Sequence, residues 1–162
     1  MMIEHPLKPI YNEASRVLIL GTMPSPKSRE EGIYYGHPRN RFWKVMAYLF
    51  DEWTPLTVQE RTEFALRYHF ALWDVLKSCD IKGASDASIK EPVANDISII
   101  LDAAPISAIF CTGTKAHSLY VKHIEPAVRR PAFRLPSTSP ANCAVPFFQL
   151  CEDYMEIKRY LL

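Results

Sequence analysis

Four short apolar runs alternate with amphipathic segments along this chain, and this alternation constrains the fold more than any other feature. Short apolar runs bounded by turn residues are typical of buried strands, whereas apolar residues spaced by three or four are typical of helices. Strands are predicted at residues 16–21, 70–75, 106–112 and 132–135. Helices are predicted from residue 38 or 40 to about 50, from 57 to about 68, from 95 or 96 onward, at 114–124 and at 145–162.

Strands that alternate with helices predict a mainly parallel sheet, because each helical crossover returns the next strand in the same direction. We therefore expect one domain over residues 1–162, of the α/β class: a three-layer α/β/α sandwich around four strands, with residues 16–21 inside the sheet. Residues 22–37 are expected to form a long loop, and residues 78–91 a polar, irregular stretch. Ligands of such sheets bind outside the carboxyl ends of the strands.

The balance of charge excludes a strongly basic nucleic-acid-binding protein. Nineteen lysines and arginines are matched by eighteen acidic residues, so the formal net charge is only +1 and gives no global attraction for DNA. A DNA-binding role therefore depends on two local basic clusters, at residues 27–44 and at residues 122–134. The competing interpretation is ordinary solvated surface charge.

The spacing of the four cysteines argues against a metal centre. They are Cys79, Cys111, Cys143 and Cys151, and none forms a Cys-x-x-Cys pair, so we expect no zinc, no iron–sulfur cluster and no other cofactor. The first residues lack the apolar core of a signal peptide, and no apolar run approaches the length of a membrane span. We expect a cytoplasmic protein with reduced thiols and no membrane partner.

Residues 35–43, Tyr-Gly-His-Pro-Arg-Asn-Arg-Phe-Trp, concentrate aromatic, basic and amide side chains in nine positions. Arg39 and Arg41 interleave with the aromatic residues, as a site for a nucleobase and its phosphates requires. Pro38 is typical of a helix start, so Asn40 is expected in the first helical turn, where unpaired N–H groups point at a ligand. The spacing alone is equally compatible with an ordinary loop and a helix that buries two core aromatic residues.

Three blocks of the sequence together resemble the uracil-DNA glycosylase superfamily. They are residues 17–25 (Val-Leu-Ile-Leu-Gly-Thr-Met-Pro-Ser), residues 35–43, and residues 135–142 (Leu-Pro-Ser-Thr-Ser-Pro-Ala-Asn). The first resembles the water-activating loop, the second the His-Pro-x-Asn-Arg-Phe-Trp signature of the mismatch-specific branch, and the third the loop that presses into the DNA minor groove. The third block points to the hypoxanthine-DNA glycosylase-like family, and the match runs in register from about residue 16 to the C-terminus.

This resemblance implies a monofunctional DNA glycosylase of base excision repair, which hydrolyses the N-glycosidic bond of a deaminated base: hypoxanthine, xanthine or uracil. The implied partner is DNA that contains a damaged base, and we expect a monomer. Two alternatives stay open. One is a mismatch-specific uracil-DNA glycosylase, and the other is a nucleotide- or DNA-binding module that has lost catalysis.

The resemblance implies that Asn40 is the catalytic residue that positions water, with a plain helix cap as the alternative. Many superfamily members use an Asp or Asn two residues after the Gly that ends the first strand, but here this position is Met23, whose thioether orients water poorly. Tyr35 is expected to be the aromatic platform for the flipped base, with Tyr34 as the alternative. The residues expected to bind the substrate base are Gly21, Thr22, Met23, Pro24, Tyr35 and His37. For His37, a contact with a phosphate and a purely structural role before Pro38 are the alternatives.

Contacts with the DNA backbone are expected from the third block and from nearby arginines. Pro140 and Ala141 are expected to wedge into the gap left by the flipped nucleotide, with a plain proline-rich turn as the alternative. Asp74, which ends the second predicted strand, is expected to position a loop rather than to catalyse. The expected DNA-binding residues are Arg39, Arg130, Arg134, Ser137, Thr138, Ser139, Pro140 and Asn142.

Overall fold

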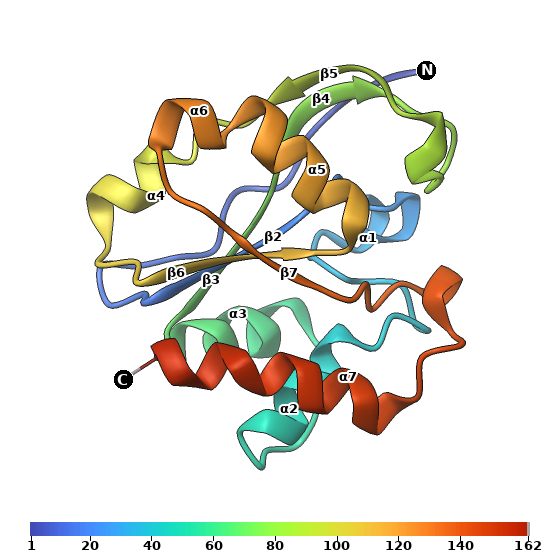
Figure 1. Cartoon of the computed structure of the whole chain (residues 1–162). Coiled ribbons are helices and arrows are strands. Elements are labelled where there is room, and N and C mark those ends of the chain that lie inside the picture. The colour runs from blue at the N-terminus through green and yellow to red at the C-terminus, as the bar shows by residue number, and fades with distance from the viewer. Residues whose placement is uncertain (162) are drawn as a thin grey trace.

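A four-stranded parallel sheet forms the centre of the molecule, which the computed structural model describes over residues 1–161 (Figure 1). All three pairings between neighbouring strands are parallel. The strand order is β3-β2-β6-β7, where the strands are β2 (Val17–Gly21), β3 (Phe70–Asp74), β6 (Ala108–Thr112) and β7 (Phe133–Leu135). Every residue of β2, β3 and β6 is buried, as the continuous apolar runs predict for strands covered on both faces. The predicted inner position of β2 is confirmed.

Helices cover both faces of this sheet, which confirms the predicted three-layer architecture. One layer contains α2 (Phe42–Leu49), α3 (Val58–Arg67) and α7 (Phe147–Tyr154) (Figure 1). The other layer contains α4 (Ser98–Ala103), α5 (Thr114–His123) and α6 (Glu125–Val128) (Figure 1). The helix α3 begins at a capping box formed by Thr57 and Glu60, as their spacing predicts.

The segment at residues 22–37 and the C-terminal helix both differ from the prediction. Residues 22–37 are not all loop, because α1 (Pro26–Glu31) forms within them. Ser25 caps this helix by accepting a hydrogen bond from the Ser28 N–H at 3.1 Å, and Gly32 ends it in the left-handed conformation. The last helix is shorter than predicted: α7 ends at Tyr154, and a 3-10 helix, η3 (Met155–Tyr160), continues the chain.

The stretch at residues 78–91 was predicted to be irregular, and this is wrong, because it contributes to a second sheet. This antiparallel sheet has the order β1-β4-β5, where the strands are β1 (Met2–Glu4), β4 (Leu76–Asp80) and β5 (Lys90–Ala94). A short 3-10 helix, η1 (Asp86–Ser88), lies between β4 and β5. Only Leu76 and Cys79 of β4 are buried, so the strand is polar in composition and its apolar signal is weak.

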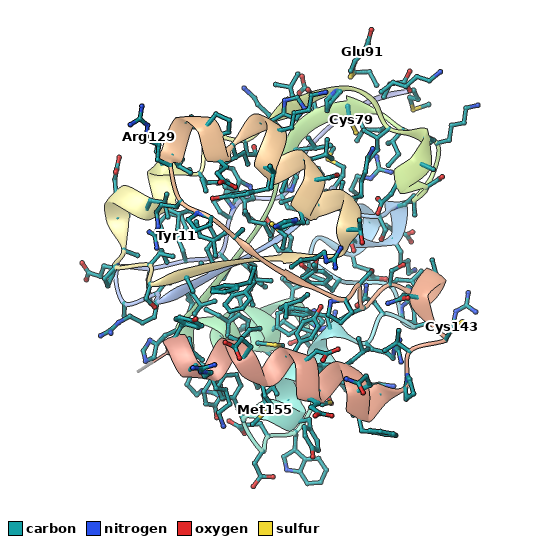
Figure 2. The ribbon with its side chains drawn as sticks, in the orientation of Figure 1. Tyr11, Cys79, Glu91, Arg129, Cys143 and Met155 are labelled. Atoms are coloured by element: carbon teal, nitrogen blue, oxygen red, sulfur yellow. The ribbon has the colours of Figure 1, made fainter. Side chains whose placement is uncertain are left out.

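Side chains fill the space on both sides of the parallel sheet (Figure 2). In the layer of α2 and α3 the core is aromatic: the Phe42 ring packs edge-on against Trp43 and against Phe70 of β3, with centroids 5.1 Å and 6.4 Å away. Trp43 donates from Nε1 to the Tyr34 carbonyl at 2.8 Å. These contacts hold the residue 34–43 segment against the sheet.

Candidate active site

A cavity of about 300 Å³ lies at the carboxyl ends of β2, β3 and β6. Its walls come from residues 21–25 after β2, residues 34–40 before α2, the ends of β3 and β6, and residues 137–141 after β7. All three sequence motifs therefore meet at the edge of the sheet where ligands are expected. Every residue predicted to bind the base borders this cavity, as does Asn40: the set is Gly21, Thr22, Met23, Pro24, Tyr35, His37 and Asn40.

Gly21 forms the floor of the cavity, and the floor requires a residue without a side chain. A Cβ atom at this position would lie 2.5 Å from Oδ1 of Asp74, 3.3 Å from the Tyr35 hydroxyl and 3.6 Å from Oγ1 of Thr112. The first of these distances is too short for any normal contact between non-bonded atoms. The Tyr35 hydroxyl and Thr112 Oγ1 lie 3.1 Å apart and share a hydrogen bond. Three oxygen atoms from three separate segments thus converge above Gly21.

Tyr35 supplies a fixed aromatic wall. Its ring stacks on Phe42, with the centroids 4.0 Å apart and the planes 16° from parallel. Its backbone adopts a φ of 55°, a left-handed conformation that bulky residues rarely adopt and that is often found at functional sites. Burial raises the pKa of the Tyr35 hydroxyl, and the negative charge of Asp74 raises it further, so the hydroxyl stays protonated. Tyr34 also borders the cavity, but its hydroxyl donates to the Lys8 carbonyl at 2.7 Å.

Asn40 borders the cavity but does not lie in the first turn of a helix, contrary to the prediction. The helix α2 begins two residues later, at Phe42, because Oδ1 of Asn40 accepts a hydrogen bond from the Phe42 N–H at 2.9 Å and the Asn40 N–H donates to the His37 carbonyl at 2.9 Å. The Asn40 side chain is therefore held in one orientation just ahead of α2. His37 is fixed next to it, because its Nδ1 accepts from the Arg39 N–H at 3.0 Å.

Asp74 lies in the wall of the cavity itself, at the end of β3. Its side chain is only 5% exposed, and Oδ2 lies 2.7 Å from Nε2 of His5, whose side chain is 2% exposed. The position of Asp74 at the carboxyl end of an apolar strand is a sequence signal for a site residue. No comparable signal pointed to His5, which lies near the start of the chain and outside all three motifs.

The third motif forms a loop that Arg41 fastens to the rest of the site. The Arg41 guanidinium donates to the Val145 carbonyl at 2.6 Å and to the Asn142 carbonyl at 3.0 Å, and the Arg41 N–H donates to the Thr138 carbonyl at 3.1 Å. Arg41 was predicted to belong to a basic cluster that serves a nucleobase and its phosphates, whereas these contacts give it a structural role. The Asn142 amide donates to the Ser137 carbonyl at 2.9 Å, so it too stabilises the loop.

Thr138 differs from the other polar residues of this loop. Its side chain is 1% exposed and borders the cavity, and Oγ1 has no hydrogen-bond partner within residues 1–161. Ser139 and Ala141 lie nearer the surface, where the Ser139 hydroxyl accepts from the Ala141 N–H at 3.2 Å. Thr138 is therefore buried against the cavity, whereas the prediction placed it among the contacts with the DNA backbone.

Two of the three predicted arginines lie near the cavity. Arg39 is exposed close to Asn40, and Arg134 lines a broader groove of about 990 Å³ that shares residues 84, 86, 137, 139 and 141 with the cavity. Arg130 lies elsewhere: its guanidinium donates to the Ile106 carbonyl at 2.7 Å, ahead of β6 and thus at the opposite edge of the sheet. In Figure 2 its neighbour Arg129 and the loop residue Cys143 are at opposite ends of the molecule. We therefore no longer assign a DNA contact to Arg130.

Comparison with known proteins assigns the chain to a family. The model of the Uracil DNA glycosylase superfamily matches residues 8–156. The chain belongs to this superfamily. A protein named hypoxanthine DNA glycosylase from Methanosarcina barkeri is 34% identical over 110 residues, which cover 67% of this chain and 70% of that relative. A second protein of that name, from Methanosarcina acetivorans, is 30% identical over 145 residues, which cover 87% of this chain and 89% of that relative.

The fold comparison agrees with this membership of the uracil DNA glycosylase superfamily. A solution NMR structure from Methanosarcina acetivorans, of a protein assigned provisionally as a uracil DNA glycosylase, superposes with a TM-score of 0.79. The alignment covers 98% of this chain and 99% of that structure at 24% sequence identity, so it bears on the fold alone. The superfamily and fold inferred from the three motifs are confirmed.

Neither a metal cluster nor a membrane span is found in the part of the chain that the structure describes. Within residues 1–161 no three His, Cys, Asp or Glu side chains gather as a metal ion would require. None of the helices in this range combines the length and the apolar character needed to cross a bilayer. The four cysteines are free thiols, and Cys143 is the exposed one.

Replacing Gly21 should disturb the site through Asp74. In G21A the new Cβ would lie 2.5 Å from Oδ1 of Asp74, so the carboxylate must move away from its partner His5. We expect the free energy of unfolding, measured by urea denaturation, to fall by about 1–3 kcal/mol, the usual cost of overpacking. A double-mutant cycle with D74A tests the cause, because removal of the carboxylate makes room for the Cβ. An undiminished cost of G21A in the D74A background would contradict the contact assigned here.

Proposed function

We propose that this chain is a monofunctional DNA glycosylase that hydrolyses the N-glycosidic bond of a deaminated base, with hypoxanthine as the preferred base. The observation that carries the proposal is one cavity bordered by Gly21, Tyr35 and Asn40, in a chain whose relatives are named hypoxanthine DNA glycosylase. Its partner is DNA with a damaged base, and the hydrolysis requires no cofactor. The monomeric state and the cytoplasmic location stay predictions from the sequence.

Binding begins when the base leaves the DNA stack, which costs a few kcal/mol and is cheapest for a poorly paired base. Tyr35, backed by Phe42, offers a fixed ring on which the flipped base can stack. Thr22, Met23 and His37 enclose other sides of the same cavity. Stacking on an aromatic ring tolerates different bases, so this platform suits purines and pyrimidines alike.

Cleavage produces an oxocarbenium-like sugar and a base that leaves with the electron pair of the glycosidic bond, so the site must stabilise charge and position a water molecule. The thioether of Met23 cannot position water, and Asn40 takes this role. One lone pair of its Oδ1 is held by the Phe42 N–H, and the other accepts a hydrogen bond from the water. The backbone N–H groups of Thr22 and Met23 are the proposed donors to the departing base.

The residues that border the cavity favour water as the nucleophile. No lysine borders the cavity within residues 1–161, so an amine that would form a covalent intermediate with the sugar is absent from this part of the site. The expected product is an abasic site with an intact DNA backbone. Asn40 lies just ahead of α2, whose N-terminal dipole favours the negative charge that develops as the base departs.

The DNA backbone is proposed to follow the broader groove beside the cavity. Arg134 lines this groove and Arg39 is exposed next to Asn40, so these two arginines are the proposed phosphate contacts. Ser137 and Ser139 border both the groove and the cavity. Pro140 and its neighbour Ala141 are the proposed wedge that fills the gap in the stack. Thr138 is assigned to the base, because it is buried against the cavity.

Removal of the Asn40 side chain should abolish most of the activity and leave the fold in place. We expect N40A to excise hypoxanthine at least about a hundredfold more slowly in single-turnover assays, the usual scale for losing one transition-state contact. N12A is a matched control, because Oδ1 of Asn12 accepts from the Ala14 N–H at 2.9 Å in the same local pattern, on an exposed segment. A wild-type rate in N40A would show that Asn40 only caps the chain ahead of α2.

The preferred substrate can be tested with matched duplexes. Hypoxanthine pairs weakly with several partners, so flipping it costs less than flipping a well-paired base. Wild-type protein should therefore release hypoxanthine faster than uracil opposite adenine, when equal enzyme acts on duplexes of one sequence under single-turnover conditions. N40A supplies the background rate for both duplexes. Faster release of uracil would favour a uracil-specific enzyme, and cleavage of neither base would favour a binding module.

A further inference from the structure

The proposed mechanism does not use Asp86, a carboxylate that borders both the cavity and the broader groove. It begins η1 in the loop between β4 and β5, and in Figure 1 this loop and the loop after β7 are both on the right of the molecule. Within residues 1–161, the residues that border both hollows are Ala84, Asp86, Ser137, Ser139 and Ala141. Asp86 is the charged member of this set.

The junction of the cavity and the groove is where the deoxyribose of a flipped nucleotide must lie. In the proposed function the base enters the cavity and the DNA backbone follows the groove, and the sugar is the unit that joins them. The other carboxylates are placed elsewhere. Asp74 borders the cavity but not the groove, and its Oδ2 is 2.7 Å from Nε2 of His5. Asp153 and Glu156 border the groove but not the cavity.

Hydrogen bonds within its own loop hold the backbone of Asp86 and leave its carboxylate free. The Ser88 hydroxyl donates to the Ser85 carbonyl at 2.7 Å and accepts from the Lys82 N–H at 2.8 Å. The Ile89 N–H donates to the Asp86 carbonyl at 3.3 Å. The Asp86 carboxylate itself makes neither a hydrogen bond nor an ion pair within residues 1–161.

The Asp86 carboxylate lacks a compensating positive charge in the free protein. The residue is exposed, yet the protein atoms around its carboxyl displace water and raise its pKa, and the positive charge of Lys115 offsets this only in part. A negative charge at this point also repels DNA phosphates, so a phosphate contact does not account for it. A positive charge beside the carboxylate would satisfy it.

Cleavage creates such a charge on the sugar. The C1′–N9 bond of deoxyinosine breaks with its electron pair on the base, and positive charge develops over C1′ and O4′. The water oxygen then bonds to C1′, and the proton that the water loses ends on the released hypoxanthine. Asp86 forms none of these bonds. A carboxylate beside the ring stabilises the charged sugar more than the neutral sugar of the substrate, and this difference lowers the barrier.

We propose that Asp86 is a further catalytic residue, whose carboxylate contacts the deoxyribose of the flipped nucleotide and stabilises the positive charge that develops there. This inference rests on the proposed glycosylase function. It assigns the three parts of the reaction to three groups: Tyr35 stacks on the base, Asn40 positions the water, and Asp86 stabilises the sugar.

The test uses two uncleavable DNA duplexes that differ by one charge. One carries a neutral tetrahydrofuran in place of the sugar, and the other carries a pyrrolidine whose ring nitrogen takes the place of C1′ and is protonated at neutral pH. Wild-type protein should bind the pyrrolidine duplex at least about tenfold more tightly, measured by fluorescence anisotropy at one salt concentration. D86N should lower this ratio at least about tenfold, because it keeps the shape of the side chain and removes its charge.

Two further variants separate the charge at this position from other effects. D86E keeps the charge and should keep a ratio well above that of D86N. D153N is the matched control, because Asp153 borders the groove alone, where its Oδ1 accepts from Nε2 of Gln149 at 3.1 Å, and it should leave the ratio unchanged. D86N should bind the tetrahydrofuran duplex at least as tightly as wild-type protein, which shows that it is folded. A ratio unchanged in D86N, or lowered equally by D153N, would overturn the inference.

Excision rates distinguish failure of this inference from failure of the proposed function. In single-turnover assays D86N should excise hypoxanthine at least about tenfold more slowly than wild-type protein. If wild-type protein excises no deaminated base, the glycosylase function fails, and the inference fails with it. If wild-type protein excises hypoxanthine and D86N keeps both its rate and its preference for pyrrolidine, the inference alone fails. A slower D86N that keeps the preference would assign Asp86 to proton transfer and would also overturn the inference.

Discussion

The candidate active site depends on the close approach of the backbone at Gly21 to the carboxylate of Asp74. These two residues are opposite each other in the parallel pairing of β2 and β3, and the Val75 N–H donates to the Gly21 carbonyl at 2.7 Å. Because no Cβ stands between them, the oxygen atoms of Asp74, Tyr35 and Thr112 reach one point from three segments. The missing side chain therefore creates both the space for a base and the polar floor that faces it.

Two sets of contacts hold the other motifs against this floor. The Phe42 ring backs Tyr35 at 4.0 Å between centroids, so the aromatic core below the sheet extends into the wall of the cavity. Arg41 follows Asn40 directly and holds residues 138–145 in place through three hydrogen bonds, to the carbonyls of Thr138, Asn142 and Val145. One short segment thus positions the proposed platform, the proposed catalytic amide and the proposed DNA wedge together. Such preorganisation is what charge stabilisation in a transition state requires.

The fold was predictable where burial is strong and local patterns are clear. The continuous apolar runs of β2, β3 and β6 identified the parallel sheet, and the capping box at Thr57 identified the start of α3. The second sheet was not predictable in the same way, because one exposed face makes β4 polar in composition. The start of α2 was misplaced because Pro38 is typical of a helix start, whereas the Asn40 side chain holds the Phe42 N–H and delays the helix by two residues.

The site was predictable only in part, because its residues are assembled by the fold. The three motifs predicted Gly21, Tyr35 and Asn40 as site residues, and the structure brings them to one cavity. His5 could not be found from the sequence, since it meets Asp74 across 69 residues and no periodicity links them. The predicted DNA contact of Arg130 was misplaced for the opposite reason. Arg130 is close to the third motif in sequence, but β7 lies between them and leads across the sheet to the other edge.

The most direct test is a crystal structure of the protein on duplex DNA that carries 2′-fluoro-2′-deoxyinosine, whose fluorine destabilises the oxocarbenium-like sugar and so preserves the glycosidic bond. We expect a flipped hypoxanthine stacked on Tyr35, with a water between Asn40 and the sugar. Arg39 and Arg134 should face phosphates in the same complex. A base that stays in the duplex, or DNA bound to a face away from the cavity, would contradict the assignment of this cavity as the active site.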